Sequence, residues 1–179
     1  MEEKRLFDIL KLYIAKYPSQ EVALAKKESG SWKKYSIQKY IEITNNISYA
    51  LIKLGIKKDD KVGIICNNRP EWNMLDMAIM QVGAITVPIY PTISKEDYHY
   101  IINDCEVKLI VLEGQSVLQK IESVKDESPS LTGVYTIGTK SDYPTFDQLV
   151  EIGKSNPDPE ELKKREDNVD EKDCATIIY

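Results

Sequence analysis

Five short apolar runs constrain this chain more than any other feature of its sequence. They lie at residues 62–66, 84–90, 107–113, 133–137 and 174–178. Each run is continuously apolar rather than alternating with polar residues, as expected of parallel strands that are buried on both faces. Helical patterns separate consecutive runs, and strand–helix–strand repetition is typical of a parallel sheet with right-handed crossovers. The sequence therefore predicts an α/β fold, a layered and mostly parallel sheet with flanking helices.

Residues typical of helix ends mark where the predicted helices begin and stop. The apolar spacing from Leu6 to Ile14 predicts a first helix that ends before Pro18. Pro70 suits the first position of another helix, and Gly83 suits its end. Further helices are predicted at residues 37–54, 95–105, 117–124 and 146–153. The side chains that can cap the start of these helices are Ser36, Ser94 with Asp97, and Thr145 with Gln148.

An antiparallel β-hairpin is predicted ahead of the parallel part of the chain. Residues 22–25 and 32–36 are β-prone and flank the turn-forming sequence Glu-Ser-Gly. A proline within the run at residues 84–90 indicates that this strand lies near a sheet edge or at a bulge.

The negative charge of the chain is concentrated near one end. The chain has 24 basic and 29 acidic residues, a net charge of −5. Residues 151–173 hold nine acidic and five basic residues, so they carry −4 of this charge. We expect three parts: an α/β subdomain at 1–150, an acidic linker with a short helix at 151–173, and the start of a strand at 174–179.

Composition removes several classes of function. A pI near 5.1 argues against a nucleic-acid partner, and no run approaches the roughly 18 apolar residues that span a membrane. Three separated cysteines and one histidine make no metal-ligand set, so we expect no metal site. The N-terminus lacks the apolar core of a secretory signal, which predicts a cytoplasmic location.

Two turns after predicted strands are the candidate sites, because ligands of parallel sheets bind beyond the carboxyl ends of the strands. In the first, Arg69 could bind an anion, but we favour the alternative that Pro70, Glu71 and Trp72 start and anchor a helix. In the second, Tyr90 and Thr92 are candidate substrate-binding residues, and a rigid turn is the alternative. The glycines around residues 133–138 flank a strand rather than form a phosphate loop.

The same blocks resemble the N-terminal part of the acyl-adenylate-forming enzymes, which bind AMP. The boxes Asn-Arg-Pro-Glu-Trp at 68–72 and Val-Pro-Ile-Tyr-Pro-Thr at 87–92 are similar to those of the long-chain fatty acid–CoA ligase branch. The resemblance is specific over residues 55–112 and weaker over 113–165. It implies that the chain folds as the N-terminal subdomain of that enzyme fold.

The resemblance also implies a reaction. Family members convert a fatty acid and ATP to an acyl-AMP and pyrophosphate, and coenzyme A then displaces AMP. Their phosphate loop, adenine site and catalytic lysine follow the segment that corresponds to residues 174–179, and they use Mg²⁺. We therefore expect an N-terminal fragment that is inactive alone, has no catalytic residue and no bound cofactor, and exposes apolar surface through which it could self-associate. Long-chain members often contact membranes peripherally.

Two other functions stay open from the sequence. One is a free-standing flavodoxin-like α/β module for binding or regulation. The other is the N-terminal part of a different adenylate-forming ligase, for example one that acts on acetate or an aryl acid. The reading frame beyond Tyr179 would distinguish the free-standing module from a ligase. The residues of the acyl pocket would distinguish another adenylate-forming ligase from a long-chain fatty acid–CoA ligase.

Overall fold

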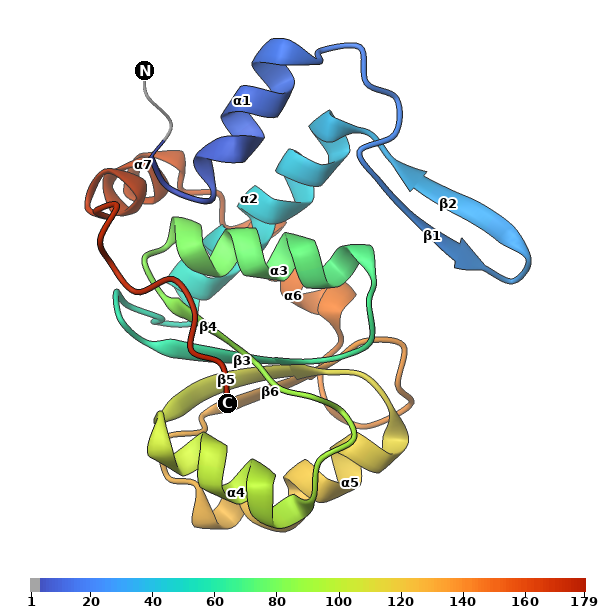
Figure 1. Ribbon diagram of the computed structural model, residues 1–179, viewed down its shortest axis with the longest axis vertical. Helices are drawn as coiled ribbons and strands as arrows, with labels where there is room; N and C mark the ends of the chain where they lie inside the picture. The colour runs from blue at the N-terminus through green and yellow to red at the C-terminus, as the bar shows by residue number, and fades with distance from the viewer. Residues whose placement is uncertain (1–3) are drawn as a thin grey trace.

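A four-stranded parallel sheet forms the centre of the computed structural model, which describes residues 4–179 (Figure 1). The strand order is β4-β3-β5-β6, and every neighbouring pair is parallel. The strands of this sheet are β3 (Lys61–Ile65), β4 (Ile85–Pro88), β5 (Val107–Leu112) and β6 (Gly133–Thr136). The predicted α/β fold with a mostly parallel sheet is therefore confirmed.

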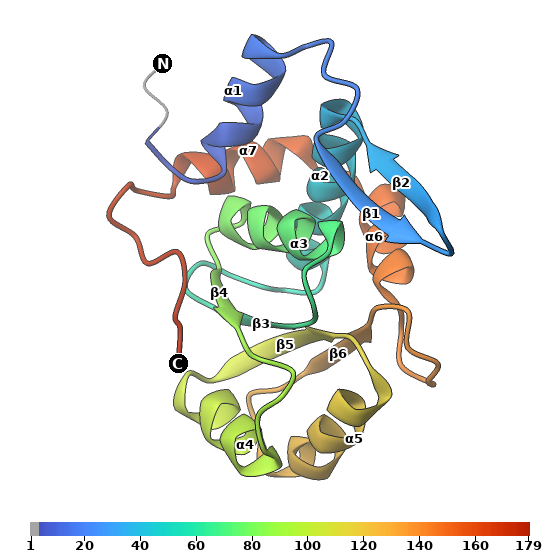
Figure 2. The ribbon, with the colours of Figure 1, turned by 45° about the vertical axis from the view of Figure 1, so that its right-hand side comes forward.

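Helices cover both faces of the sheet, so each strand is buried on two sides (Figures 1 and 2). One layer contains α2 (Ile37–Lys53), α3 (Pro70–Gln81) and α6 (Phe146–Ser155). The opposite layer contains α4 (Lys95–Asp104) and α5 (Gln115–Val124), followed by the 3-10 turn Lys125–Glu127. Two separate hydrophobic clusters fill the spaces between the sheet and these layers. This burial explains the continuously apolar strands.

The predicted helix ends are confirmed by hydrogen bonds. Ser36 accepts a bond from the Lys39 amide at the start of α2, and Gly55 follows the helix with a φ of +82°. Capping boxes start α4, with Ser94 and Asp97, and α6, with Thr145 and Gln148. Pro70 is the first residue of α3, and Gly83 closes it with a φ of +79°.

The predicted hairpin forms a separate two-stranded sheet of β1 (Leu24–Glu28) and β2 (Ser31–Tyr35). Ser29 and Gly30 both have a positive φ, as a two-residue turn between right-twisted strands requires. The first helix, α1 (Asp8–Lys16), precedes this hairpin. Leu10 is the only fully buried apolar residue of α1, Phe7 is buried directly before the helix, and much of the apolar surface of α1 faces outward.

The last expected strand is reduced to a single bridge. Within residues 174–178, Thr176 alone pairs with Thr86, parallel to β4. The Thr86 amide donates to the Ala175 carbonyl (3.1 Å), and the Ile177 amide donates to the Thr86 carbonyl (3.0 Å). The next residue of β4 on that edge is Pro88, which has no N–H to extend a ladder. This explains the short pairing, and β4 is one of the two edge strands of the sheet, as its proline predicted.

The acidic segment contains the expected short helix, α7 (Pro159–Asp167). The Arg165 guanidinium donates to Glu161 (2.7 Å), four residues earlier, and also to the Ile56 carbonyl (3.0 Å). Leu162 and Glu166 are buried, and Glu166 accepts a bond from Lys11 (2.6 Å). This helix therefore packs against the body of the molecule. The division of the chain at residues 150 and 173 stays a prediction.

Candidate functional site

The topological switch point of the sheet lies between β3 and β5. The connection from β3 passes through α3 on one face, and the connection from β5 passes through α5 on the other. Open parallel sheets usually bind ligands in the crevice beyond the carboxyl ends of two such strands. Here Glu113, directly after β5, bridges to the turn that follows β3. Its carboxylate accepts a bond from the Asn67 amide (3.1 Å) and forms an ion pair with Arg69.

Glu71 continues this network on the other side of Arg69. Its carboxylate accepts bonds from Arg69 Nε (2.9 Å) and from Lys26 Nζ of the hairpin (2.7 Å). Burial by itself would raise the pKa of Glu71, but the bonds from Arg69 and Lys26 outweigh it and lower the pKa to about 2. Arg69 thus has a carboxylate on each side. This arrangement does not favour Arg69 as an anion ligand, because two carboxylates already neutralise its guanidinium.

A cavity of about 490 Å³ opens beside this network, at the carboxyl ends of β3 and β4. The residues that line it include Cys66, Asn67, Asn68, Trp72, Tyr90, Pro91, Thr92 and Ile178. The two predicted substrate-binding residues, Tyr90 and Thr92, are thus brought together with the turn that follows β3. Tyr90 is 69% exposed, and the Tyr98 hydroxyl donates to its carbonyl (3.0 Å), which fixes the backbone of this turn.

The chemistry of the cavity is neutral and amphipathic. No residue that lines it is charged: the aromatic faces of Trp72 and Tyr90 stand beside the amides of Asn67 and Asn68. Burial raises the pKa of the Cys66 thiol to about 12, so this cysteine is protonated and is not a nucleophile at neutral pH. The cavity can hold an uncharged or apolar group with a few polar atoms, but it supplies no acid or base.

Two other sequence features do not belong to this cavity. Gly133 is the first residue of β6, and the Thr139 hydroxyl accepts a bond from the Gly114 amide (2.8 Å), so this stretch forms no phosphate cradle. His99 lies on α4, in the opposite layer, 3.5 Å from Glu127.

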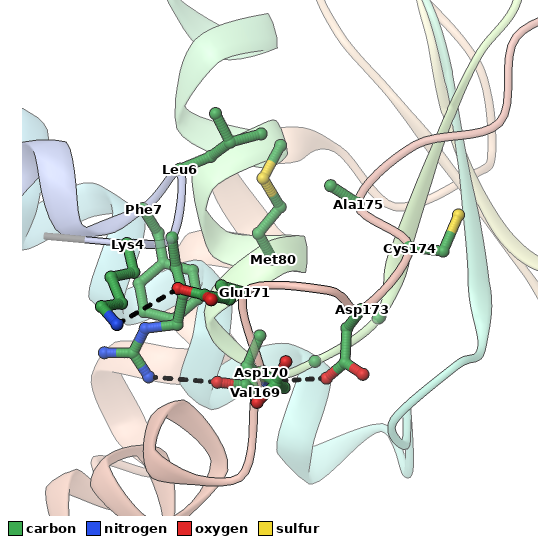
Figure 3. A pocket seen from close by; sticks show the side chains of 13 residues that line it. Lys4, Leu6, Phe7, Met80, Val169, Asp170, Glu171, Asp173, Cys174 and Ala175 are labelled. Carbon is green, nitrogen blue, oxygen red and sulfur yellow. Dashed lines mark hydrogen bonds and ion pairs between the residues drawn. The ribbon is translucent and has the colours of Figure 1, made fainter.

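A second pocket, of about 280 Å³, lies between the N-terminal segment, the end of α3 and residues 169–175 (Figure 3). Lys4 forms an ion pair with Glu171 (3.5 Å), and the Arg5 guanidinium donates to the Val169 carbonyl (3.5 Å). Asp173 forms an ion pair with Lys58 (2.6 Å). These contacts join residues far apart in the sequence, so the pocket is a junction between distant segments of the chain.

Sequence reasoning missed the partners that arrange the site. Glu113 and Lys26 lie 44 and 45 residues from the groups that they bind, so no local spacing connects them. The available signal was the position of Glu113 directly after a predicted strand. Among residues 4–179, no group of three or more histidine, cysteine or acidic side chains could hold a metal ion. Nor does any helix within them have the length and apolarity to span a membrane.

Comparisons with known proteins identify relatives of this chain. The long-chain-fatty-acid–CoA ligase ACSBG2 of Xenopus laevis is 35% identical over 163 residues, which cover 88% of this chain and 22% of that protein. The long-chain-fatty-acid–CoA ligase FadD15 of Mycobacterium bovis is 37% identical over 141 residues, which cover 77% of this chain and 23% of that protein. The chain therefore spans less than a quarter of the length of these relatives.

The fold is shared with solved structures of such enzymes. A Mycobacterium tuberculosis fatty acyl CoA synthetase matches with a TM-score of 0.77 and 20% identity, over 98% of this chain and 32% of that one. A family model described as AMP-binding enzyme matches residues 11–179. Because that match covers nearly the whole chain, the chain belongs to the AMP-binding enzyme family.

Proposed function

We propose that the complete protein is an ATP-dependent long-chain fatty acid–CoA ligase. A fatty carboxylate oxygen attacks the α-phosphorus of ATP, which forms acyl-AMP and releases pyrophosphate. The sulfur of coenzyme A then attacks the acyl carbon, and AMP leaves with the bonding electrons of the acyl–oxygen bond. The observation that carries this proposal is the match of residues 11–179 to the AMP-binding enzyme family, with relatives named as long-chain-fatty-acid–CoA ligases.

The residues of this chain do not fit the ionic parts of that reaction. A site for ATP phosphates and Mg²⁺ needs backbone amides at a glycine-rich turn, carboxylate oxygens or free cations. In residues 4–179, the glycines at 133–138 border a strand, Arg69 is neutralised, and no acidic cluster could hold a metal. We therefore assign ATP, Mg²⁺ and coenzyme A to the complete enzyme and no catalytic residue to this chain.

We infer that Tyr90 and Thr92 contribute to substrate binding. Their cavity is uncharged and partly aromatic, which suits an apolar group better than a phosphate. In the complete enzyme, Tyr90→Ala and Thr92→Ala should raise KM for the fatty acid more than KM for ATP. Tyr100→Ala is the matched control, because Tyr100 is also exposed (60%) but lies on α4 and outside this cavity. Equal effects on both substrates would remove this assignment.

We further propose that the 179-residue chain alone has no ligase activity. Adenylation depends on groups that position ATP and stabilise the charge that develops on its phosphates. Loss of one group of this kind typically lowers the rate a hundredfold to a thousandfold. The test is fatty-acid-dependent exchange of labelled pyrophosphate into ATP, by this chain and by the product of the complete reading frame. Exchange by this chain would refute its inactivity, and no exchange by the complete product would refute the ligase proposal.

The same assay separates the alternatives. Exchange that depends on acetate or an aryl acid, but not on a long-chain acid, would identify another adenylate-forming ligase. A stop codon directly after Tyr179 would favour a free-standing flavodoxin-like module. Family membership favours a ligase over that module, because it rests on nearly the whole chain.

A further inference from the structure

A further cavity, of about 290 Å³, lies between the turn after β4, helix α4 and the last residue of the chain. Its lining includes three tyrosines, one from each of these segments: Tyr90, Tyr100 and Tyr179. All three are exposed, at 69%, 60% and 45%. Exposed aromatic side chains that gather around one cavity indicate a binding site. Tyr90 also lines the cavity with Thr92, but Tyr100 and Tyr179 do not.

The fold holds these three tyrosines in place. The Tyr179 hydroxyl donates to the Asp104 carboxylate of α4. The rings of Tyr100 and Tyr179 meet edge to face, with their centroids 6.1 Å apart and their planes at 90°. Two rings at a right angle form an aromatic corner. The third tyrosine, Tyr90, follows β4, and its backbone is fixed because the Tyr98 hydroxyl donates to its carbonyl (3.0 Å).

The electrostatics of this cavity favour a cation. The face of an aromatic ring carries partial negative charge. Among the described residues that line the cavity, Asp97 is the only charged one. It lies three residues before Tyr100 on α4, so both side chains project from one face of the helix. Hydrogen bonds from the Ser94 hydroxyl and amide lower the pKa of Asp97, so its carboxylate is ionised at neutral pH. An anionic ligand would therefore be repelled.

Hydrogen-bond acceptors beside the cavity are engaged within the protein. Asp97 Oδ2 accepts from the Ser94 hydroxyl (2.6 Å), and the Tyr90 carbonyl is occupied as described. The Ile93 carbonyl accepts from Lys120 Nζ (2.6 Å), and Lys120 does not itself line the cavity. A primary ammonium group needs several acceptors, because it has three N–H donors. A quaternary ammonium ion needs none and binds to aromatic faces. The cavity therefore suits a quaternary ammonium ion better than a primary amine.

We propose that this cavity, with Tyr90, Asp97, Tyr100 and Tyr179 in its lining, binds a small soluble quaternary ammonium ion. Each exposed ring beside such a cation tightens binding about two- to fivefold. A volume of about 290 Å³ is at the lower end for ligand cavities, so it suits an ion of the size of choline better than a nucleotide. This proposal does not rest on the ligase proposal, because it is tested by binding without ATP or coenzyme A.

Choline and its neutral isostere 3,3-dimethylbutanol provide the test, because they have the same shape and differ by one positive charge. Each compound is titrated into the complete protein, and binding is measured by saturation-transfer NMR of its methyl protons. We expect choline to bind with a Kd in the millimolar range. The isostere should bind roughly tenfold more weakly or less, because it loses the attraction of three rings and a carboxylate.

Two variants with matched controls locate the bound choline. Tyr100→Leu should weaken choline binding about two- to fivefold, whereas Tyr100→Phe, which keeps the ring, should change it less than about twofold. Tyr13→Leu is the control, because Tyr13 is 40% exposed on α1 and does not line the cavity. Asp97→Asn should weaken binding about threefold, since it removes the charge and keeps an acceptor for the α4 cap. Its control is Glu96→Gln, an exposed neighbour outside the lining, which should have a smaller effect.

Three results would overturn the proposal. The first is no binding of choline to the complete protein at about 10 mM. The second is equal binding of choline and 3,3-dimethylbutanol, which would show that the cavity recognises apolar shape and not charge. The third is equal weakening of choline binding by each test variant and its control, which would place the bound choline elsewhere. Circular dichroism of every variant verifies that the fold is retained.

Discussion

Glu71→Gln is the substitution that most directly tests the ionic network at the end of β3. The change keeps the shape of the side chain and removes its charge. Glu71 is 6% exposed and is bound by both Arg69 and Lys26, so the variant leaves two cations beside a neutral amide. Removal of one partner from a buried ion pair is strongly destabilising, because the other charge stays buried. We expect the folded state to lose stability at pH 7.

The pKa of Glu71 gives the magnitude of this loss. A carboxyl group whose pKa falls from 4.5 to about 2 on folding contributes about 3 kcal/mol to the free energy of unfolding. Because the folded-state pKa is lowered, this contribution is complete above pH 4.5 and is lost as the pH falls toward 2. At pH 3.5 about 2 kcal/mol should remain. The difference between wild type and Glu71→Gln should therefore shrink on acidification.

Urea unfolding followed by far-ultraviolet circular dichroism measures this difference at pH 7 and pH 3.5. Glu42→Gln is the matched control, since Glu42 forms an ion pair with Lys39 on the exposed face of α2. Exposed pairs contribute little, so we expect a change below about 1 kcal/mol in the control. The reasoning is refuted if Glu71→Gln unfolds at the same urea concentration as wild type, or if its deficit is unchanged between the two pH values.

Three further substitutions test packing and capping. Trp72→Ala should lower the free energy of unfolding by about 2–4 kcal/mol, because Trp72 is half-buried against the core cluster. An unchanged melting temperature would contradict its role as the anchor of α3. Gly153→Ala should lower the free energy of unfolding by about 3 kcal/mol or more, because an added Cβ would collide with the Asn46 carbonyl of α2. In the same melting experiment, the control Lys154→Ala on the exposed face should be near neutral. Thr145→Ala should cost about 1 kcal/mol by urea unfolding through loss of the α6 cap, and no change would show that the cap is dispensable.

Most of the fold could be predicted because its signals are local. Apolar runs buried on both faces identified the four strands, and capping residues such as Ser94 and Thr145 fixed the helix starts. The run at 174–178 looked like the others, but its pairing depends on the edge of β4, where Pro88 lacks a donor. The outward position of the apolar face of α1 could not be predicted either. Residue spacing predicts that a helix has an apolar face but does not predict what covers that face.

The candidate site could be predicted only in part. Tyr90 and Thr92 were expected at the end of one strand, and the structure places them beside the turn that follows its neighbour. Their role in binding stays a proposal. The state of Arg69 could not be predicted, because Glu113 reaches it from a strand more than forty residues later. Contacts of this kind are determined by strand order, which the sequence does not specify locally.

The ion pairs between the two ends of the chain have a consequence for its synthesis. Lys11 of α1 is bound to Glu166, and Arg5 donates to the Glu166 carbonyl, so the first helix has partners made 155 residues or more later. At ribosomal rates of roughly 5–20 residues per second, α1 would wait about 8–30 s for them. During that interval α1 can pack against α2 but lacks its polar contacts with α7. The final docking of the first helix should therefore follow the synthesis of α7.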